Sequence, residues 1–374
     1  DRFSILSEHL RRVCEIADRY GCKPLMWADM FFRLANKGEY YCVMGEIPQQ
    51  VIDLVPKNVE LIYWDYYSLD KAHYDGMIRA HKQFHNNVVF AGGAMSWIGF
   101  APNNRFSMEA CRAALQSCAE NGVDDVFITC WKDDGAECSL YSSLPALFYA
   151  AEIARGNSDE AKIEKKFRKL TGIGMRAFLA LDGVNLRGGG DGMNNPCKYM
   201  LYSDPFLGIF DCTAEGHGGE EFAAARRELA AGAKSARYGY IFKTLAALCD
   251  AMEIKFTLGV RTREAYQRKD RDALEELIGE YKELEGRLGK FYKRFAEQWA
   301  RECKPNGFEK QDIRLGGLQL RVKHCRKRLR QYCEGKLSSL PELEEKILPL
   351  HGVKPGDSVC YNNWASISMI KPNM

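Results

Sequence analysis

An aromatic side chain followed closely by carboxylates forms the densest cluster of chemically capable residues in this sequence. It lies in the run Thr129-Cys-Trp-Lys-Asp-Asp-Gly-Ala-Glu-Cys-Ser139. The indole of Trp131 could supply a flat apolar surface, and Asp133, Asp134 and Glu137 could accept hydrogen bonds from hydroxyl groups. Such a combination suits the C–H-rich face and the hydroxyl rim of a sugar. The alternative is an acidic loop that caps a helix beside a packed tryptophan.

The same Trp-x-Asp spacing occurs a second time, at Trp27 and Asp29. In an extended strand, residues two apart point to the same side, so an aromatic platform and a hydrogen-bond acceptor could address one ligand. A third cluster, Tyr63-Trp-Asp-Tyr-Tyr67, adds Asp65 and Tyr66 as candidate contacts. One or two of its aromatic side chains must still point inward as core.

Short apolar runs position these residues, because each run closes on a tryptophan. Trp27, Trp64, Trp97 and Trp131 are spaced by 37, 33 and 34 residues, the length of a strand plus a helix. The carboxyl ends of parallel strands meet at one edge of a sheet, where α/β proteins bind ligands. We therefore expect the tryptophans to gather at that edge. The third strand end, Gly92-Gly-Ala-Met-Ser-Trp97, has small residues that would let a ligand approach closely.

The sequence gives no sign of a metal ion, a cofactor or a nucleophilic serine. His81 and His85 have the i, i+4 spacing of a ligand pair, but we expect both at surface helix positions. The fourteen cysteines lie singly, without CxxC or Cys/His ligand spacing, as in a reduced protein. No G-x-S-x-G motif is present.

The overall charge excludes several classes of partner. Fifty-three basic and 50 acidic residues leave a net charge of +3, which does not favour nucleic acid or an anionic membrane surface. The local basic run from Arg321 to Arg330 is interpreted as a solvated or acid-paired helix face. No signal peptide and no run of 18 apolar residues is present, which favours a cytoplasmic protein without a membrane span.

The periodicity changes at about Gly156. Residues 1–155 show four strand-plus-helix units, which predict an α/β fold with four parallel strands, half of a (β/α)8 TIM barrel. Residues 156–348 show long amphipathic helices and predict an all-α domain, and residues 349–374 predict an extended tail. The first residues have helical spacing and no preceding strand, so we expect barrel strands upstream of Asp1. The helical stripes could form a bundle core within the chain or a dimer interface, and we expect a homodimer.

Four segments together carry a resemblance to a known family. They are Lys23-Pro-Leu-Met-Trp-Ala-Asp-Met-Phe-Phe-Arg33, the runs 63–67 and 129–139, and Lys304-Pro-Asn-Gly-Phe-Glu-Lys-Gln-Asp-Ile-Arg-Leu-Gly-Gly317. The first three resemble the later barrel strands of a glycoside hydrolase family 20 β-N-acetylhexosaminidase. This resemblance implies that residues 1–155 are the C-terminal half of a (β/α)8 TIM barrel, its last four strands. The last resembles the helical C-terminal domain of the bacterial intracellular N-acetyl-β-D-glucosaminidase subgroup.

The resemblance implies an enzyme that removes terminal N-acetylglucosamine or N-acetylgalactosamine from glycans with retention of configuration. In that family the substrate's own acetamido oxygen is the nucleophile, an exception to the two-carboxylate scheme. A Glu acts as general acid, and the adjacent Asp orients the acetamido group. This Asp-Glu pair belongs at the end of the fourth barrel strand. We therefore expect it upstream of Asp1, and we expect no catalytic residue and no activity in this chain alone.

The resemblance also implies roles for single residues. Trp27, Trp64 and Trp131 match the pocket-lining tryptophans, and Asp133 matches a carboxylate that holds sugar hydroxyls. Tyr66 could hydrogen-bond the acetamido carbonyl, since the third strand end lacks the Tyr-x-Asp of other subgroups. The predicted substrate-binding set is Trp27, Asp29, Trp64, Asp65, Tyr66, Trp97, Trp131, Asp133 and Glu137.

Two other functions stay open from the sequence. The chain could be a non-catalytic assembly or dimerisation module, or another barrel glycosidase that uses Asp65 with Asp133 or Glu137 as acid and base. The segment 311–314 either reaches the pocket or forms a helix-capping salt bridge.

Overall fold

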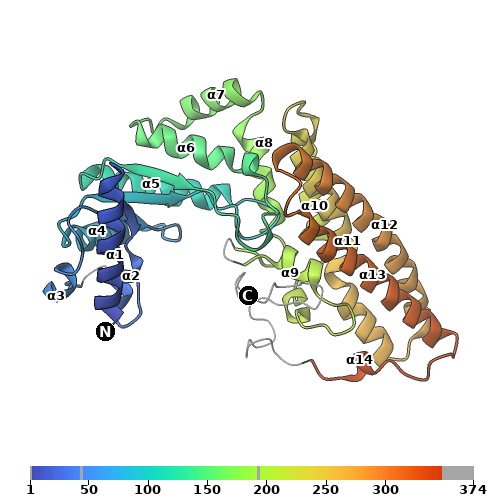
Figure 1. Ribbon diagram of the computed structural model, residues 1–374. Helices are drawn as coiled ribbons and strands as arrows, with labels where there is room; N and C mark the ends of the chain where they lie inside the picture. The colour runs from blue at the N-terminus through green and yellow to red at the C-terminus, as the bar shows by residue number, and fades with distance from the viewer. Residues whose placement is uncertain (1, 43–44, 192–193, 348–374) are drawn as a thin grey trace. The chain divides into compact units, whose positions relative to one another are not determined.

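The chain folds into two compact units. The computed structural model describes residues 2–42, 45–191 and 194–347 (Figure 1). The first unit consists of Asp1–Met95, Asn104–Trp131 and Pro145–Ile163, and the second of Ser96–Asn103, Lys132–Leu144 and Glu164–Met374. Two loops of the predicted α/β part therefore belong to the second unit. The domain boundary at residue 155 stays a prediction, and the predicted tail 349–374 lies outside the described residues.

A single sheet of four parallel strands forms the centre of the first unit. The strands pair in the order β1-β2-β3-β4, with Trp27 opposite Ile62, Trp64 opposite Ala91, and Gly93 opposite Thr129. This confirms the four predicted parallel strands. Their bounds are β1 Leu25–Trp27, β2 Glu60–Trp64, β3 Val88–Gly93 and β4 Val126–Thr129.

Helices alternate with these strands along the chain. The helix after β3 begins at Asn104, and the hydroxyl of Ser107 in its first turn accepts a hydrogen bond from the Met95 amide at 2.8 Å. It is followed by Gly122 in the left-handed conformation that favours glycine. The helices up to the change of unit are α1 Arg2–Arg19, α2 Asp29–Ala35, α3 Gln49–Ile52, α4 Lys71–Lys82, α5 Asn104–Glu120, α6 Leu144–Ala154 and α7 Glu160–Thr171.

The two faces of the sheet are packed differently. On one face Leu61, Tyr63 and Phe90 belong to a large core that includes residues of α1, α2, α4 and α5. On the other face Ile62, Val89 and Ala91 form a small cluster against Trp27 and Trp64. Strand alternation places the edge residues Leu25 and Phe127 on this second face, where they are 49% and 38% exposed. Apolar side chains thus remain partly open to solvent on one side of the sheet.

The second unit is built from helices. Three long ones, α11 Gly239–Gln267, α12 Arg271–Glu302 and α13 Phe308–Cys333, follow one another, and α12 packs against both of the others. The predicted stripe along α12 is buried, which supports a bundle core within the chain: Leu277, Tyr281, Leu284, Leu288, Phe291, Phe295 and Trp299. The shorter helices of this unit are α8 Met175–Leu179, α9 Pro196–Tyr202, α10 Gly219–Glu228 and α14 Pro341–Glu344. Short 3-10 helices are η1 Asp133–Gly135, η2 Leu140–Ser143, η3 Ala180–Val184, η4 Asp211–Ala214 and η5 Gly232–Lys234.

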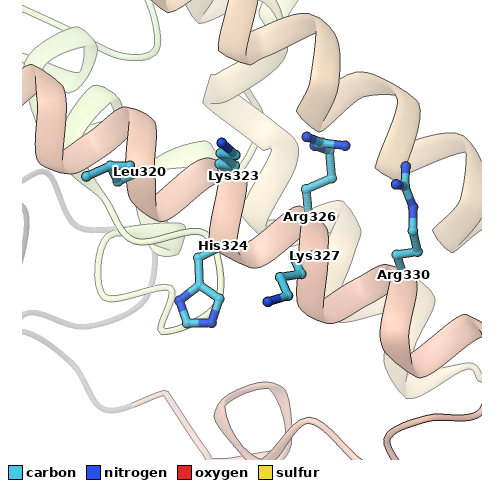
Figure 2. A pocket seen from close by; sticks show the side chains of 6 residues that line it. All are labelled: Leu320, Lys323, His324, Arg326, Lys327 and Arg330. Carbon is cyan, nitrogen blue, oxygen red and sulfur yellow. The ribbon is translucent and has the colours of Figure 1, made fainter.

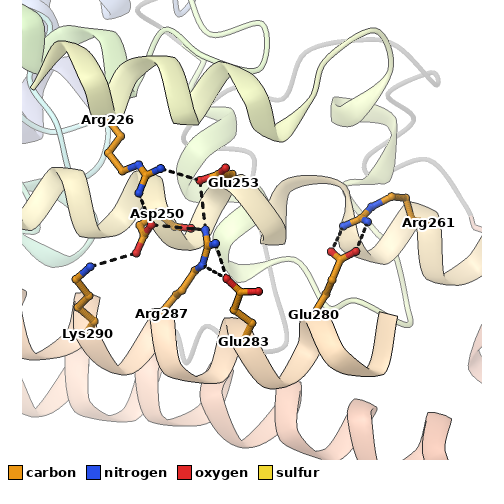
Figure 3. A network of polar contacts seen from close by, with 8 residues as sticks. All are labelled: Arg226, Asp250, Glu253, Arg261, Glu280, Glu283, Arg287 and Lys290. Atoms are coloured by element: carbon orange, nitrogen blue, oxygen red, sulfur yellow. Dashed lines mark hydrogen bonds and ion pairs between the residues drawn. The ribbon is translucent and has the colours of Figure 1, made fainter. Parts of the chain in front are cut away.

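Ion pairs link α10, α11 and α12 along their solvent side (Figure 3). Asp250 on α11 accepts from Arg226 of α10 at 2.7 Å and lies 3.3 Å from Lys290 of α12. Farther along, Arg261 and Glu280 form a two-pronged pair, with N–O distances of 2.7 and 2.5 Å. Partly exposed pairs contribute about 0–1 kcal/mol each. The apolar stripe therefore supplies most of the stability, and the ion pairs favour one register of the helices.

His81 is a buried member of the first unit's core, so the expectation of a surface position is wrong. Its ring lies 4.3 Å from the ring of Phe32 and 4.7 Å from that of Tyr63. The Nδ1–H donates to the Met77 carbonyl at 2.7 Å, while Nε2 is buried without a hydrogen-bond partner among the described residues. Burial lowers the pKa of His81 to about 3.

This burial predicts an acid-labile first unit. The folded His81 stays neutral down to about pH 3, whereas an unfolded histidine takes up a proton near pH 6.5. Its contribution to stability is complete above pH 6.5 and is lost as the pH falls, by about 2 kcal/mol between pH 7 and pH 5. In urea unfolding, His81→Leu should remove this part of the pH dependence. The matched control His9→Gln, at an exposed position of α1, should keep it, and an unchanged pH dependence in His81→Leu would contradict the account.

Candidate functional site

Three of the four predicted tryptophans gather at the carboxyl end of the sheet in the first unit. Trp27 ends β1, Trp64 ends β2, and Trp131 follows two residues after β4. The rings of Trp27 and Trp131 lie 5.8 Å apart, although β1 and β4 are the two edges of the sheet. Strands spaced by about 4.8 Å would separate these edges by about 14 Å. The two side chains therefore extend toward one another across the end of the sheet.

Further aromatic rings connect Trp64 to Trp131. Trp64 lies 5.3 Å from the ring of Tyr66, and the Trp131 Nε1–H donates to the Tyr66 hydroxyl at 3.0 Å. Tyr66 is buried, whereas Trp131 remains 39% exposed. The exposed part of this continuous aromatic cluster is thus a candidate platform for a flat ligand.

Sequence reasoning missed Tyr40, which fixes the end of β2. Its ring stacks on Trp64, with the ring centres 4.9 Å apart. Its hydroxyl donates to the Trp64 carbonyl at 3.0 Å and accepts from the Trp64 amide at 3.3 Å. Burial, strengthened by the negative charge of Asp65, raises the pKa of Tyr40 well above its usual range. Tyr40 comes from the loop after α2. The only local hint in the sequence is that two tyrosines, Tyr40 and Tyr41, are adjacent there.

Asp65 lies at the same end of the sheet, but its carboxylate serves the protein itself. Its Oδ2 accepts from the Tyr63 hydroxyl at 3.1 Å and lies 2.7 Å from Nε2 of His73. Its Oδ1 accepts from the Tyr67 amide at 3.1 Å. With both oxygens engaged and the side chain buried, Asp65 is arranged to hold the strand end and to orient His73. His73, on the first turn of α4, is a further polar residue that the sequence pattern did not reveal.

The strand-alternation argument is wrong for Asp29, because the strand does not continue that far. β1 ends at Trp27, Ala28 has helical backbone angles, and Asp29 is the first residue of α2. The Asp29 carboxylate accepts from Arg33 Nε at 3.4 Å, one helical turn away. The same correction applies to Asp133, which begins η1 instead of extending β4.

The remaining predicted site residues belong to the second unit. Trp97 is buried in the segment 96–103, and Asp133 is exposed. Glu137 is buried, with its Oε1 2.9 Å from Lys198 Nζ of α9 and 3.3 Å from Arg314 Nη1 of α13. This pairing leaves Glu137 poorly suited to act as a solvent-accessible acid or base.

The segment 311–314 contacts the loop that follows β4. Gln311 donates from Nε2 to the Gly135 carbonyl at 2.6 Å, and Arg314 pairs with Glu137. Both side chains are buried. The segment therefore forms a long-range contact with residues 135–137 instead of a local helix cap.

The basic run on α13 is partly paired with acids, as expected. Arg321, Arg326 and Arg328 pair with Asp204, Glu285 and Glu342. A shallow pocket on the same helix is lined by Leu320, Lys323, His324, Arg326, Lys327 and Arg330 (Figure 2). Its lining consists of Leu320, His324 and four cationic side chains and includes no indole or phenyl ring, which makes it a weaker candidate for sugar binding than the tryptophan cluster.

Within the described residues, no group of His, Cys, Asp and Glu is arranged to hold a metal ion. The cysteines of these residues form no disulfide. None of the described helices is both long and apolar enough to cross a membrane.

Comparison with known proteins places part of the chain in a family. Residues 176–361 match the Glycoside Hydrolase 20C C-terminal domain. This chain carries a C-terminal domain of glycoside hydrolase family 20. No curated protein matches the chain. A similar solved structure is a GH138 enzyme targeting pectin rhamnogalacturonan II, with a TM-score of 0.41 and 10% identity over 78% of this chain and 45% of that one. The chain thus spans less than half the length of that enzyme.

The family 20 match covers the part of the helical unit from residue 176 to 361 and not the tryptophan cluster. It includes α8 to α14, and with them Lys198, Gln311 and Arg314. Trp27, Trp64 and Trp131 precede the matched range. The family assignment and the aromatic cluster are therefore two separate observations.

The contacts of Asp65 predict a larger stability loss on its replacement than on that of Asp29. Asp65→Asn leaves buried donors without a carboxylate acceptor and should lower the free energy of unfolding by about 1–3 kcal/mol. Asp29→Asn, which loses only a partly exposed i,i+4 pair, should cost less than about 0.5 kcal/mol. Urea unfolding of both variants measures the difference. Equal effects would show that the Asp65 carboxylate does not hold the strand end.

Proposed function

We propose that this chain is the C-terminal portion of an exo-acting β-N-acetylhexosaminidase and binds the terminal N-acetylhexosamine of a glycan. The observation that carries the proposal is the convergence of Trp27, Trp64 and Trp131 at the carboxyl end of one parallel sheet, in a chain with a family 20 C-terminal domain. A partly exposed indole offers a face that matches the apolar face of a pyranose ring. The sugar would stack on Trp131.

The packing of the sheet supports a half barrel. In a complete (β/α)8 barrel, helices cover the outer face and side chains of eight strands fill the interior. Here the large core lies on the helix-covered face, while Leu25 and Phe127 on the other face stay partly exposed. Four further strands would bury this second face and pair with the edges β1 and β4.

The proposed reaction is substrate-assisted hydrolysis with retention. The acetamido oxygen of the sugar attacks the anomeric carbon, while a general acid protonates the departing oxygen. None of the four strand ends described here carries the Asp-Glu pair that the family resemblance requires. The first unit would then contribute the platform, through Trp131, and Asp133 of the second unit stays a predicted hydroxyl acceptor. Hydrogen bonding of Tyr66 to the acetamido group, a cytoplasmic location and the choice between the two hexosamines stay predictions.

Removal of the proposed platform tests the function directly. Trp131→Ala should weaken binding of N-acetylglucosamine to this chain about 2- to 12-fold, because stacking on an aromatic face contributes about 0.5–1.5 kcal/mol. Trp131→Phe should recover part of the affinity. The control Tyr141→Ala removes an exposed aromatic ring of the second unit and should have no effect. Calorimetric titration measures all three, and unchanged binding by Trp131→Ala would exclude Trp131 from the site.

The missing acid pair predicts that binding occurs without turnover. The purified chain should not hydrolyse p-nitrophenyl N-acetyl-β-D-glucosaminide, because proton transfer by the general acid, worth about 10²–10⁴ in rate, and acetamido positioning are both lacking. A liberated-nitrophenol assay measures this. Hydrolysis at an ordinary enzymatic rate would contradict the assignment of catalysis to residues outside this chain.

The exposed apolar face of the sheet also favours a second candidate, a homodimerisation module. Two copies could cover Leu25 and Phe127 of one another, and the exposed indole of Trp131 would contribute to the contact. Light scattering separates the two functions. A dimer that Phe127→Asp dissociates supports assembly, whereas a soluble monomer that binds the sugar supports the hexosaminidase proposal.

A further inference from the structure

The loop after β4 is held by the helical unit through a buried cluster. Residues 132–144 belong to the second unit, and the side chain of Glu137 is only 1% exposed. It meets Lys198 Nζ at 2.9 Å and Arg314 Nη1 at 3.3 Å, from α9 and α13. Both cations are themselves almost fully buried. A carboxylate in such surroundings is stable only while its cations stay in place.

Two further contacts fix the backbone on either side of Glu137. Gln311 donates to the Gly135 carbonyl at 2.6 Å, which precedes Glu137 by two residues. The Ser139 hydroxyl, two residues after Glu137, donates to Glu302 Oε1 of α12 at 2.6 Å. The loop is therefore anchored at three successive points to α9, α12 and α13.

The loop adopts a conformation that it would not favour by itself. Gly135 has φ +123°, and the following Ala136 has φ +57°, in the left-handed region that residues with a Cβ seldom occupy. A Cβ on Gly135 would lie 2.4 Å from Arg314 Nη1 and 2.7 Å from Glu137 Oε1. Only glycine allows the backbone to approach the ion pair so closely. The positive φ and the close approach to the ion pair therefore both favour glycine at position 135.

We propose that Arg314, Lys198 and Gln311 are positioning residues for this loop. Asp133 and Asp134 lie in η1, directly before the anchored residues, and Asp133 is exposed. The anchors restrict the orientations open to η1 and so place the Asp133 carboxylate for a ligand. Helices α9, α12 and α13 thereby act on a ligand-contacting residue through a loop of their own unit. That this ligand is the sugar hydroxyl rests on the proposed function.

The order of the loop can be measured without any ligand. The methyl carbon of Ala136 is attached to the backbone, so its order parameter reports backbone motion in the full chain labelled with ¹³C-methyl alanine. The resonance is assigned by Ala136→Gly. In the wild type we expect an order parameter of about 0.85, which is that of a rigid backbone, and in Arg314→Met a value below about 0.6.

Matched variants separate positioning from general stability. Arg326→Met removes another partly buried arginine of α13, paired with Glu285 at 2.6 Å, and should leave the Ala136 methyl rigid. Arg314→Lys keeps the charge beside Glu137 and should restore most of the order, which a packing role would not predict. Gln311→Met removes one neutral hydrogen bond and provides a milder test if Arg314→Met does not fold. The proposal is overturned if the Ala136 order parameter keeps its wild-type value in both Arg314→Met and Gln311→Met. If Arg314→Met does not fold, a wild-type value in folded Gln311→Met alone overturns it.

Sugar binding by the same variants tests the link to function. Arg314→Met should weaken N-acetylglucosamine binding at least 10-fold, while Arg326→Met should not. If the wild type binds no sugar, the proposed function fails, and the order of Ala136 still decides the positioning role. If the loop loosens while sugar affinity is unchanged, the positioning of Asp133 for the sugar is wrong and the proposed function stands.

Discussion

Parallel pairing of four short strands is the constraint on which the candidate site depends. Parallel strands all end at the same edge, so residues far apart in sequence arrive together there. β1 and β4 are the outermost strands, yet the rings of Trp27 and Trp131 meet. Tyr40 and Asp65 then fix the end of β2 by hydrogen bonds to backbone and side chains. The aromatic surface is a consequence of strand register and not of any single loop.

The loop after β4 depends on a different interaction, the buried pairing of Glu137 with Lys198 and Arg314. This pairing adds a second reason for the glycine at position 135, besides its positive φ, because a Cβ there would collide with Arg314. It also gives the helical domain a role beyond packing. The segment around Gln311 and Arg314, which carried part of the family resemblance, lies within the matched family 20 domain.

Sequence reasoning predicted the parts of the fold that depend on regular periodicity. The strands ending at Trp27 and Trp64 and the buried stripe of α12 follow from repeats of two and of three to four residues, which packing enforces. The side of the sheet on which Asp29 lies was not predictable from strand alternation, because a helix starts immediately after the strand and breaks the alternation. The burial of His81 was not predicted either, since an imidazole can be buried when one of its nitrogens hydrogen-bonds to a backbone carbonyl.

The contacts of the site were harder to predict than its members. Nothing in the local sequence joins Asp65 to His73 or Glu137 to Arg314, because these pairs form only when separate elements pack. The residue types and their spacing along the sequence indicated that Asp65 and Glu137 are candidate site residues. They did not indicate that both carboxylates are buried and paired with protein groups.

The most direct test of the central claim is an NMR titration of the indole N–H groups of this chain with N-acetylglucosamine. The account predicts that the resonance of the Trp131 Nε1–H, identified by its loss in Trp131→Phe, shifts on titration together with that of Trp27. Glucose, which lacks the acetamido group, should shift them less at the same concentration. If neither resonance responds to N-acetylglucosamine, or if both sugars act alike, the tryptophan cluster is not the hexosamine site proposed here.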